Sequence, residues 1–86
     1  MKREIHSGYN DLMQVEMSIK TAQKMVGSAT MSLDKDMLDG AKQAVSDAHA
    51  RLAEARHQAT GVDEEFLRRC EQELQQAEHQ LNEALK

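Results

Sequence analysis

The fold is decided most clearly by residues 34–59, DKDMLDGAKQAVSDAHARLAEARHQA. Apolar side chains recur in this stretch at alternating spacings of three and four, which places them on one face of an α-helix. They are Leu38, Ala41, Val45, Ala48, Leu52, Ala55 and Ala59. The spacing assigns them to positions a and d of a heptad, which face the neighbouring helix in a coiled coil. The stretch therefore predicts a helix that buries a narrow apolar face.

The same pattern continues on both sides of this stretch. The preceding segment carries Leu12, Val15, Ile19, Ala22, Val26, Ala29 and Leu33, and the following one carries Leu67, Cys70, Leu74, Ala77, Leu81 and Ala84. Residues suited to helix ends separate the segments, because Ser32, Asp34 and Asp63 can each cap a following helix and Gly61 suits a helix C-terminus. We expect one domain over residues 1–86, with helices at about 10–30, 34–59 and 64–85 and a frayed segment at 1–8.

The sizes of these side chains predict how the helices are arranged. Position a is mostly large and position d is mostly small, so antiparallel neighbours would pack large against small side chains. The sequence thus predicts an all-α fold, a three-helix up-down-up antiparallel bundle with coiled-coil-like heptad packing. In this register Leu52 lies near Cys70 and Val45 lies near Ala77. The flanking charges would pair Lys42 with Glu78, His49 with Glu71, and Arg56 with Glu64.

Composition limits the classes of partner. The chain has 86 residues, a net charge of −4 and no basic cluster free of acidic residues, so we expect neither nucleic acid nor an anionic membrane as a partner. No segment approaches the roughly 20 apolar residues of a membrane span. The N-terminal residues lack the apolar run of a signal peptide, and Cys70 is the single cysteine. These features predict a cytoplasmic protein.

No arrangement of residues predicts a catalytic or cofactor site. Glu54 and His57 have the Glu-x-x-His spacing of helical di-iron sites, but the third helix has Gln76 where a second copy of the motif needs Glu. No two of the four histidines are spaced to share a metal ion on one helix, and Cys70 falls on the apolar face. We expect a protein that is not an enzyme and holds no cofactor or metal. A metal-binding or enzymatic bundle that uses the Glu54/His57 face is the alternative.

Tyr9, Met13 and Met17 follow one another at steps of four along the outside of the first helix. Methionine is flexible and polarizable, which suits a surface that adapts to a protein partner. We therefore place a candidate partner surface on these three residues, in a non-enzymatic module that binds another protein or itself, with no small-molecule substrate. If both methionines are core residues, this hypothesis fails. As another alternative, the second and third helices form a hairpin that dimerises into a four-helix bundle, with the weaker first helix exchanged or peripheral.

Two stretches, DLMQVEMSIKTAQKMVGSATMSLD at 11–34 and ATGVDEEFL at 59–67, resemble a family of small uncharacterised proteins from Bacillus and related spore-forming bacteria. The resemblance extends from Asp11 to about Gln80. It implies a helical cytoplasmic protein and supplies no site residue.

Overall fold

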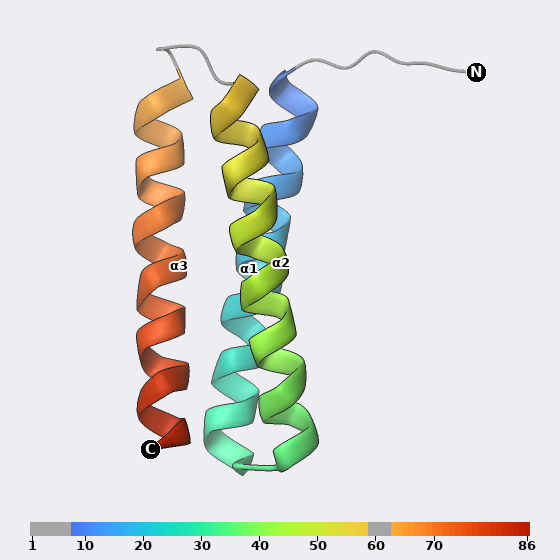
Figure 1. Cartoon of the computed structure of the whole chain (residues 1–86), viewed down its shortest axis with the longest axis vertical. Coiled ribbons are helices and arrows are strands. Elements are labelled where there is room, and N and C mark those ends of the chain that lie inside the picture. Colours follow the sequence, from blue (N-terminus) through green and yellow to red (C-terminus); the bar gives the residue numbers. More distant parts are fainter. Residues whose placement is uncertain (1–7, 59–62) are drawn as a thin grey trace, which may run out of the picture.

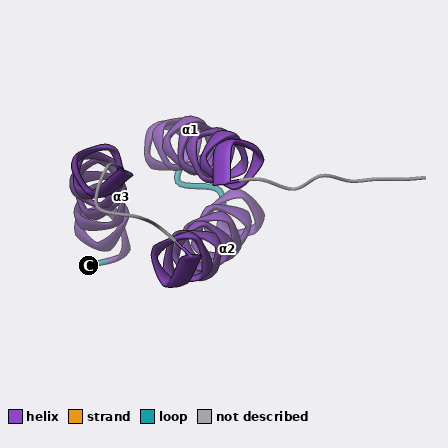
Figure 2. Cartoon of the chain, turned by 90° about the horizontal axis from the view of Figure 1, so that it is seen from above, coloured by secondary structure: helices purple, strands orange, loops and turns teal. Residues whose placement is uncertain are grey.

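Three helices make up the computed structural model, which describes residues 8–58 and 63–86 and the side chains of residues 12–57 and 63–86. They are α1 (Gly8–Ser32), α2 (Lys35–Gln58) and α3 (Glu64–Leu85). Every helix packs against both others. Figure 1 shows the end of α1, the start of α2 and the C-terminus of the chain at the same end of the molecule. Seen from above, the three helices occupy the corners of a triangle (Figure 2).

The helix ends differ slightly from the expected ones. Helix α1 is two residues longer at each end than the expected 10–30, and α2 is one residue shorter at each end than 34–59. Gly8, which we expected to be frayed, begins α1, and residues 1–7 lie outside the described part of the chain.

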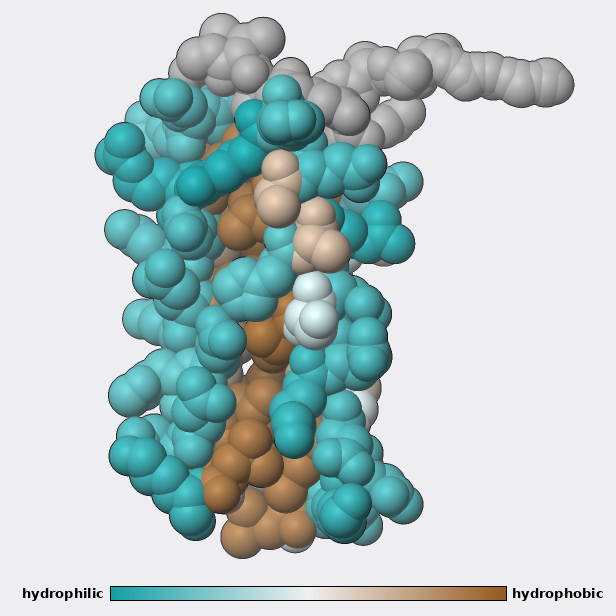
Figure 3. Space-filling model, viewed as in Figure 1, coloured by the Kyte–Doolittle hydropathy of each residue, from teal (hydrophilic) through white to brown (hydrophobic). Residues whose placement is uncertain are grey.

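The core lies on the axis enclosed by the three helices. All buried residues in the described part belong to the apolar faces predicted above, namely Val15, Ile19, Ala22, Val26, Ala29, Ala41, Val45, Ala48, Leu52, Ala55, Leu67, Cys70, Leu74, Ala77 and Leu81. None of the described polar or charged side chains is buried. Apolar side chains are visible as a strip between α3 and α2, with hydrophilic side chains on either side (Figure 3).

Leu33 departs from the prediction, because it is exposed although it continues the apolar face of the first helix. Its exposed fraction is 61% and its backbone is left-handed, with φ of 57°. The amide of Leu33 donates a hydrogen bond to the carbonyl of Ala29 at 2.7 Å, which is how a left-handed residue closes a helix C-terminus. The chain therefore turns away before the Leu33 side chain can reach the core. Ala59, which was also expected on an apolar face, lies outside the described residues.

The three expected helix caps differ in the structure. Ser32 Oγ accepts a hydrogen bond only from the amide of Asp34 at 3.1 Å, before α2 begins. Asp34 caps α2, since its Oδ1 accepts hydrogen bonds from the amides of Asp36 at 2.8 Å and Met37 at 3.2 Å. Asp63 precedes α3 but its side chain makes no cap hydrogen bond. The backbone of Asp63 is already close to helical, with φ of −89° and ψ of −5°, whereas a capping side chain needs an extended backbone. The predicted Asp63 cap is therefore wrong.

Of the three charged pairs expected between α2 and α3, two are displaced by one heptad. The third, Lys42 with Glu78, does not form among the described residues, and Glu78 lies against His49. His49 Nε2 lies 3.0 Å from Glu78 Oε1, not near Glu71, and Arg56 pairs with Glu71, not with Glu64. Side chains on a helix lean toward its N-terminus. Because α2 and α3 run in opposite directions in Figure 1, two side chains meet only when each residue lies further toward the C-terminus of its own helix than the point of contact. The expected pairs ignored this lean.

Candidate partner-binding groove

Large apolar side chains are exposed mainly on α1 and at the α1–α2 connection. In the described part of the chain they are Met13, Met17, Met25, Met31, Leu33, Met37 and, on α3, Leu85. Met13 and Met17, two residues of the candidate partner surface, are both exposed, with Met17 at 64%. Tyr9 belongs to α1, but its side chain lies outside the described residues.

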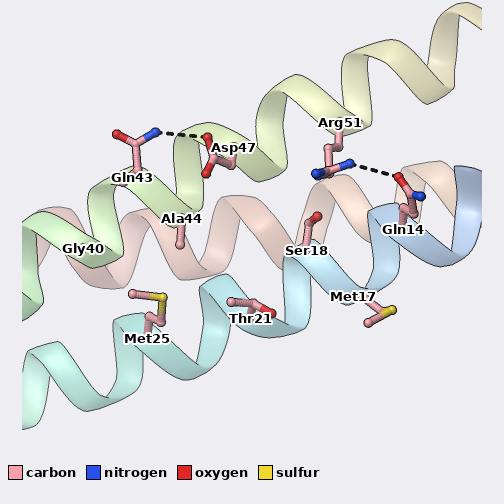
Figure 4. Close-up of a pocket in the computed structure, with 10 residues that line it drawn as sticks. All are labelled: Gln14, Met17, Ser18, Thr21, Met25, Gly40, Gln43, Ala44, Asp47 and Arg51. Carbon is pink, nitrogen blue, oxygen red and sulfur yellow. Dashed lines mark hydrogen bonds between the residues drawn. The ribbon is translucent and has the colours of Figure 1, made fainter.

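A groove with a volume of about 660 Å³ lies between α1 and α2. Figure 4 shows its walls, which come from these two helices alone. The lining residues are Gln14, Met17, Ser18, Thr21, Met25, Gly40, Gln43, Ala44, Asp47 and Arg51. Met17 and Met25 both line the groove, with Thr21 between them along α1 (Figure 4), whereas Met13 does not line it.

The groove is hollow because small residues lie where the two helices meet outside the core. Gly40 and Ala44 follow one another at a spacing of four on α2. On α1, Thr21 lies across from Ala44, and Ser18 lies further along the groove toward Arg51 (Figure 4). A Cβ added to Gly40 would lie 3.1 Å from the terminal methyl of Met25, so this methionine packs directly over the glycine. Sequence reasoning missed the groove, because Gly40 and Ala44 lie outside the predicted apolar face and add no periodic signal to it.

Polar side chains border the apolar part of the groove. Arg51 Nη1 donates a hydrogen bond to Gln14 Oε1 at 2.9 Å and so links α2 to α1. Gln43 Nε2 donates one to Asp47 Oδ1 at 3.0 Å along α2 (Figure 4). The groove therefore offers methionine and alanine side chains for apolar contact, together with one carboxylate and one guanidinium four residues apart.

The residues of the alternative metal face are placed differently. Glu54 and His57 are exposed on α2, and Glu54 lies in a small hollow with Gln14, Val15, Arg51 and Ala55. In the part of the chain with described side chains, no three His, Cys, Asp or Glu residues lie close enough to hold a metal ion.

Cys70 is a free thiol inside the core, with an exposed fraction of 3%. Burial raises the pKa of this thiol, and the negative charges of Glu73 and Glu16 raise it further, while Arg69 lowers it. A thiol that stays protonated is a weak nucleophile, so this position suits packing better than covalent chemistry. Glu16 belongs to α1, which packs against α3.

Over the described residues, none of the helices combines the length and apolarity that crossing a membrane requires.

Comparisons with known proteins identify relatives of the chain. Residues 8–86 match the family described as "Protein of unknown function (DUF2564)". The chain is also similar to the "Uncharacterized protein YpzA" of Bacillus subtilis (strain 168), with 39% identity over 80 residues, which cover 93% of this chain and 89% of that protein. No solved structure matches.

Proposed function

The chain belongs to the DUF2564 family of proteins of unknown function, and we propose that it is a non-enzymatic module that binds another protein chain through its α1–α2 groove. The observation that carries the proposal is the exposure of Met17 and Met25 beside a groove that the core does not need. Exposed apolar groups that gather on one face are typical of protein-binding surfaces. Methionine adapts its shape to a partner at little cost.

The groove favours a helix as the bound element. It runs between two packed helices, and a third helix placed there would present a ridge of side chains to them. Its apolar middle and polar borders fit an amphipathic helix with apolar residues at steps of three and four. Backbone polar groups of such a helix are bonded internally, so an apolar groove can hold it without unpaired groups.

We also propose the finer architecture, an up-down-up bundle with heptad layers. Support comes from the buried residues, which all occupy predicted a and d positions, and from the chain directions visible in Figure 1. The hydrogen bond between Arg51 and Gln14 supports the level of Val15 with Leu52, because it joins the residues that directly precede them. The alternative, a dimeric hairpin with an exchanged first helix, would have to rebuild the contacts of the five buried α1 residues.

The proposed location is the cytoplasm, where a single unpaired cysteine such as Cys70 stays reduced. The absence of enzymatic activity is likewise a proposal. It is supported by the Cys70 environment and by the exposed positions of Glu54 and His57. Calorimetric titration with Zn²⁺ tests the metal alternative, and tight stoichiometric binding that His57→Ala abolishes would establish it.

Photo-crosslinking tests the proposed binding face. A photoreactive amino acid is introduced at Met17 in the groove or, as a control, at Arg68, which is exposed on α3. After irradiation in cells of the source organism, we expect a discrete protein adduct from position 17 and none from position 68. The absence of a specific adduct from position 17 would overturn the proposal. The mass of the adduct tells whether the bound chain is another protein or a second copy.

A further inference from the structure

We infer that the groove binds a second copy of this chain, in a two-fold dimer in which α2 of one copy lies antiparallel to α2 of the other. The inference rests on the proposed function and names its partner. A two-fold interface uses the same surface on both copies, so that surface has to complement itself. The groove meets this condition in its charges and in the position of Met17.

Asp47 and Arg51 both line the groove and lie one helical turn apart on α2. If the two-fold axis crosses α2 midway between them, Asp47 of each copy faces Arg51 of the other. Two opposite-charge contacts then form in a single interface, whereas a parallel arrangement would place like charges together. Gln43 binds only Oδ1 of Asp47, and Gln14 binds only one guanidinium nitrogen of Arg51 in the bonds described above. A carboxylate and a guanidinium each have further hydrogen-bonding atoms for a partner.

The same axis brings the exposed methionine to the centre of the interface. The Arg51–Gln14 hydrogen bond and the contact of Met25 with Gly40 fix which residues of α1 and α2 lie at the same level. At that register the point midway between Asp47 and Arg51 is level with Met17. The Met17 side chains of the two copies therefore meet beside the axis, next to the part of the groove that Ser18 and Thr21 line. An apolar centre with charged pairs around it is the usual arrangement of a specific interface.

The surface is also large enough. The molecule is 40 Å long. Two adjacent helices, each about 10 Å across, give this face an area of about 800 Å². That is about the area which each partner buries in a stable complex of standard size.

Charge exchange at the two positions tests this arrangement, with the molar mass measured by sedimentation equilibrium. We expect the wild type to be a dimer. Asp47→Arg creates two contacts between like charges in the homodimer, and so does Arg51→Asp. The dissociation constant of each variant homodimer should therefore be at least about tenfold higher than that of the wild type. An equimolar mixture of the two variants should form a heterodimer of wild-type affinity, because both contacts again join opposite charges. Arg68→Asp is the matched control, because it reverses the charge of an exposed residue on α3, away from the groove. This variant should stay dimeric.

The outcomes separate the two proposals. A monomeric wild type, dimeric single variants or a mixture that does not associate would overturn the second-copy inference. If a foreign protein is then crosslinked at position 17, the proposed function stands with a different partner. If no adduct forms at position 17, the proposed function fails as well. Helical circular dichroism equal to that of the wild type shows that each exposed substitution leaves the fold intact.

Discussion

Among single residues, Leu33 combines two unfavourable features, a left-handed backbone and a largely exposed apolar side chain. Left-handed conformation costs about 1 kcal/mol or more in residues with a Cβ, and glycine adopts it freely. Leu33→Gly should therefore raise the free energy of unfolding by about 0.5–1 kcal/mol, measured by urea denaturation. Met31→Gly is the control, because Met31 is an exposed residue of α1 with an ordinary helical backbone. Glycine at that position should lower the free energy of unfolding by up to about 1 kcal/mol. A destabilised Leu33→Gly protein would contradict this account of the α1 terminus.

Leu52 is the opposite case, a large side chain that is only 5% exposed in the middle of α2. Leu52→Ala removes buried methylene groups and leaves a cavity that the neighbouring helices fill only in part. The expected loss is about 2–5 kcal/mol, a large share of the stability of a chain this small. Leu85→Ala should cost under about 1 kcal/mol, since that leucine is half-exposed. Equal losses in the two variants, measured by urea denaturation, would show that Leu52 does not belong to a tightly packed core.

At the scale of the helix, the start of α2 depends on one carboxylate. The Asp34 side chain accepts two backbone hydrogen bonds that no residue of α2 can otherwise accept at that end. Asp34→Ala should lower the free energy of unfolding by about 1 kcal/mol. Asp63 is also an aspartate that directly precedes a helix, but its side chain makes no cap hydrogen bond. Asp63→Ala should therefore lower the free energy of unfolding distinctly less. Chemical denaturation of both variants compares them directly, and equal losses would count against the cap at Asp34.

The helices themselves were largely predictable from the sequence. Each buried residue in the described part followed from a spacing of three and four, because one face of a helix has to be apolar if it is to be buried. The predicted helix already ended at residue 30, but the spacing could not show that Leu33 lies outside the core, since a left-handed residue leaves no trace in an apolar pattern. It also could not place the ion pairs, because the partners across two antiparallel helices depend on how the side chains lean and not only on which residues lie at the same level.

At the scale of the whole molecule, the candidate site was predictable only in part. The exposed Met17 could be assigned from its outward heptad position. The groove could not, because it is an empty space between two helices, and small residues such as Gly40 and Ala44 outside the apolar face give no periodic signal. A site of this kind depends on how two surfaces are placed side by side, which requires the tertiary structure.

The packing of all three helices should also be measurable through Cys70. Burial raises the pKa of its thiol, and the charge of Glu16 on α1 contributes only when α1 and α3 are packed together. A raised pKa in the folded state means that the contribution of this thiol to stability is complete at neutral pH. It is lost as the pH rises, beginning at about pH 9, where the thiol of the unfolded chain ionises.

The free energy of unfolding should therefore fall between pH 7 and pH 10 in the wild type, as measured by urea denaturation. Cys70→Ala removes the thiol and retains every other group that titrates in this range, so its stability should fall less over the same interval. Iodoacetamide should correspondingly modify the native protein slowly, because it reacts with the thiolate and the folded core both excludes it and keeps the thiol protonated. If the wild type and Cys70→Ala lose the same stability with pH, or if the native thiol reacts as fast as one in an unfolded chain, the three helices do not enclose Cys70 as described.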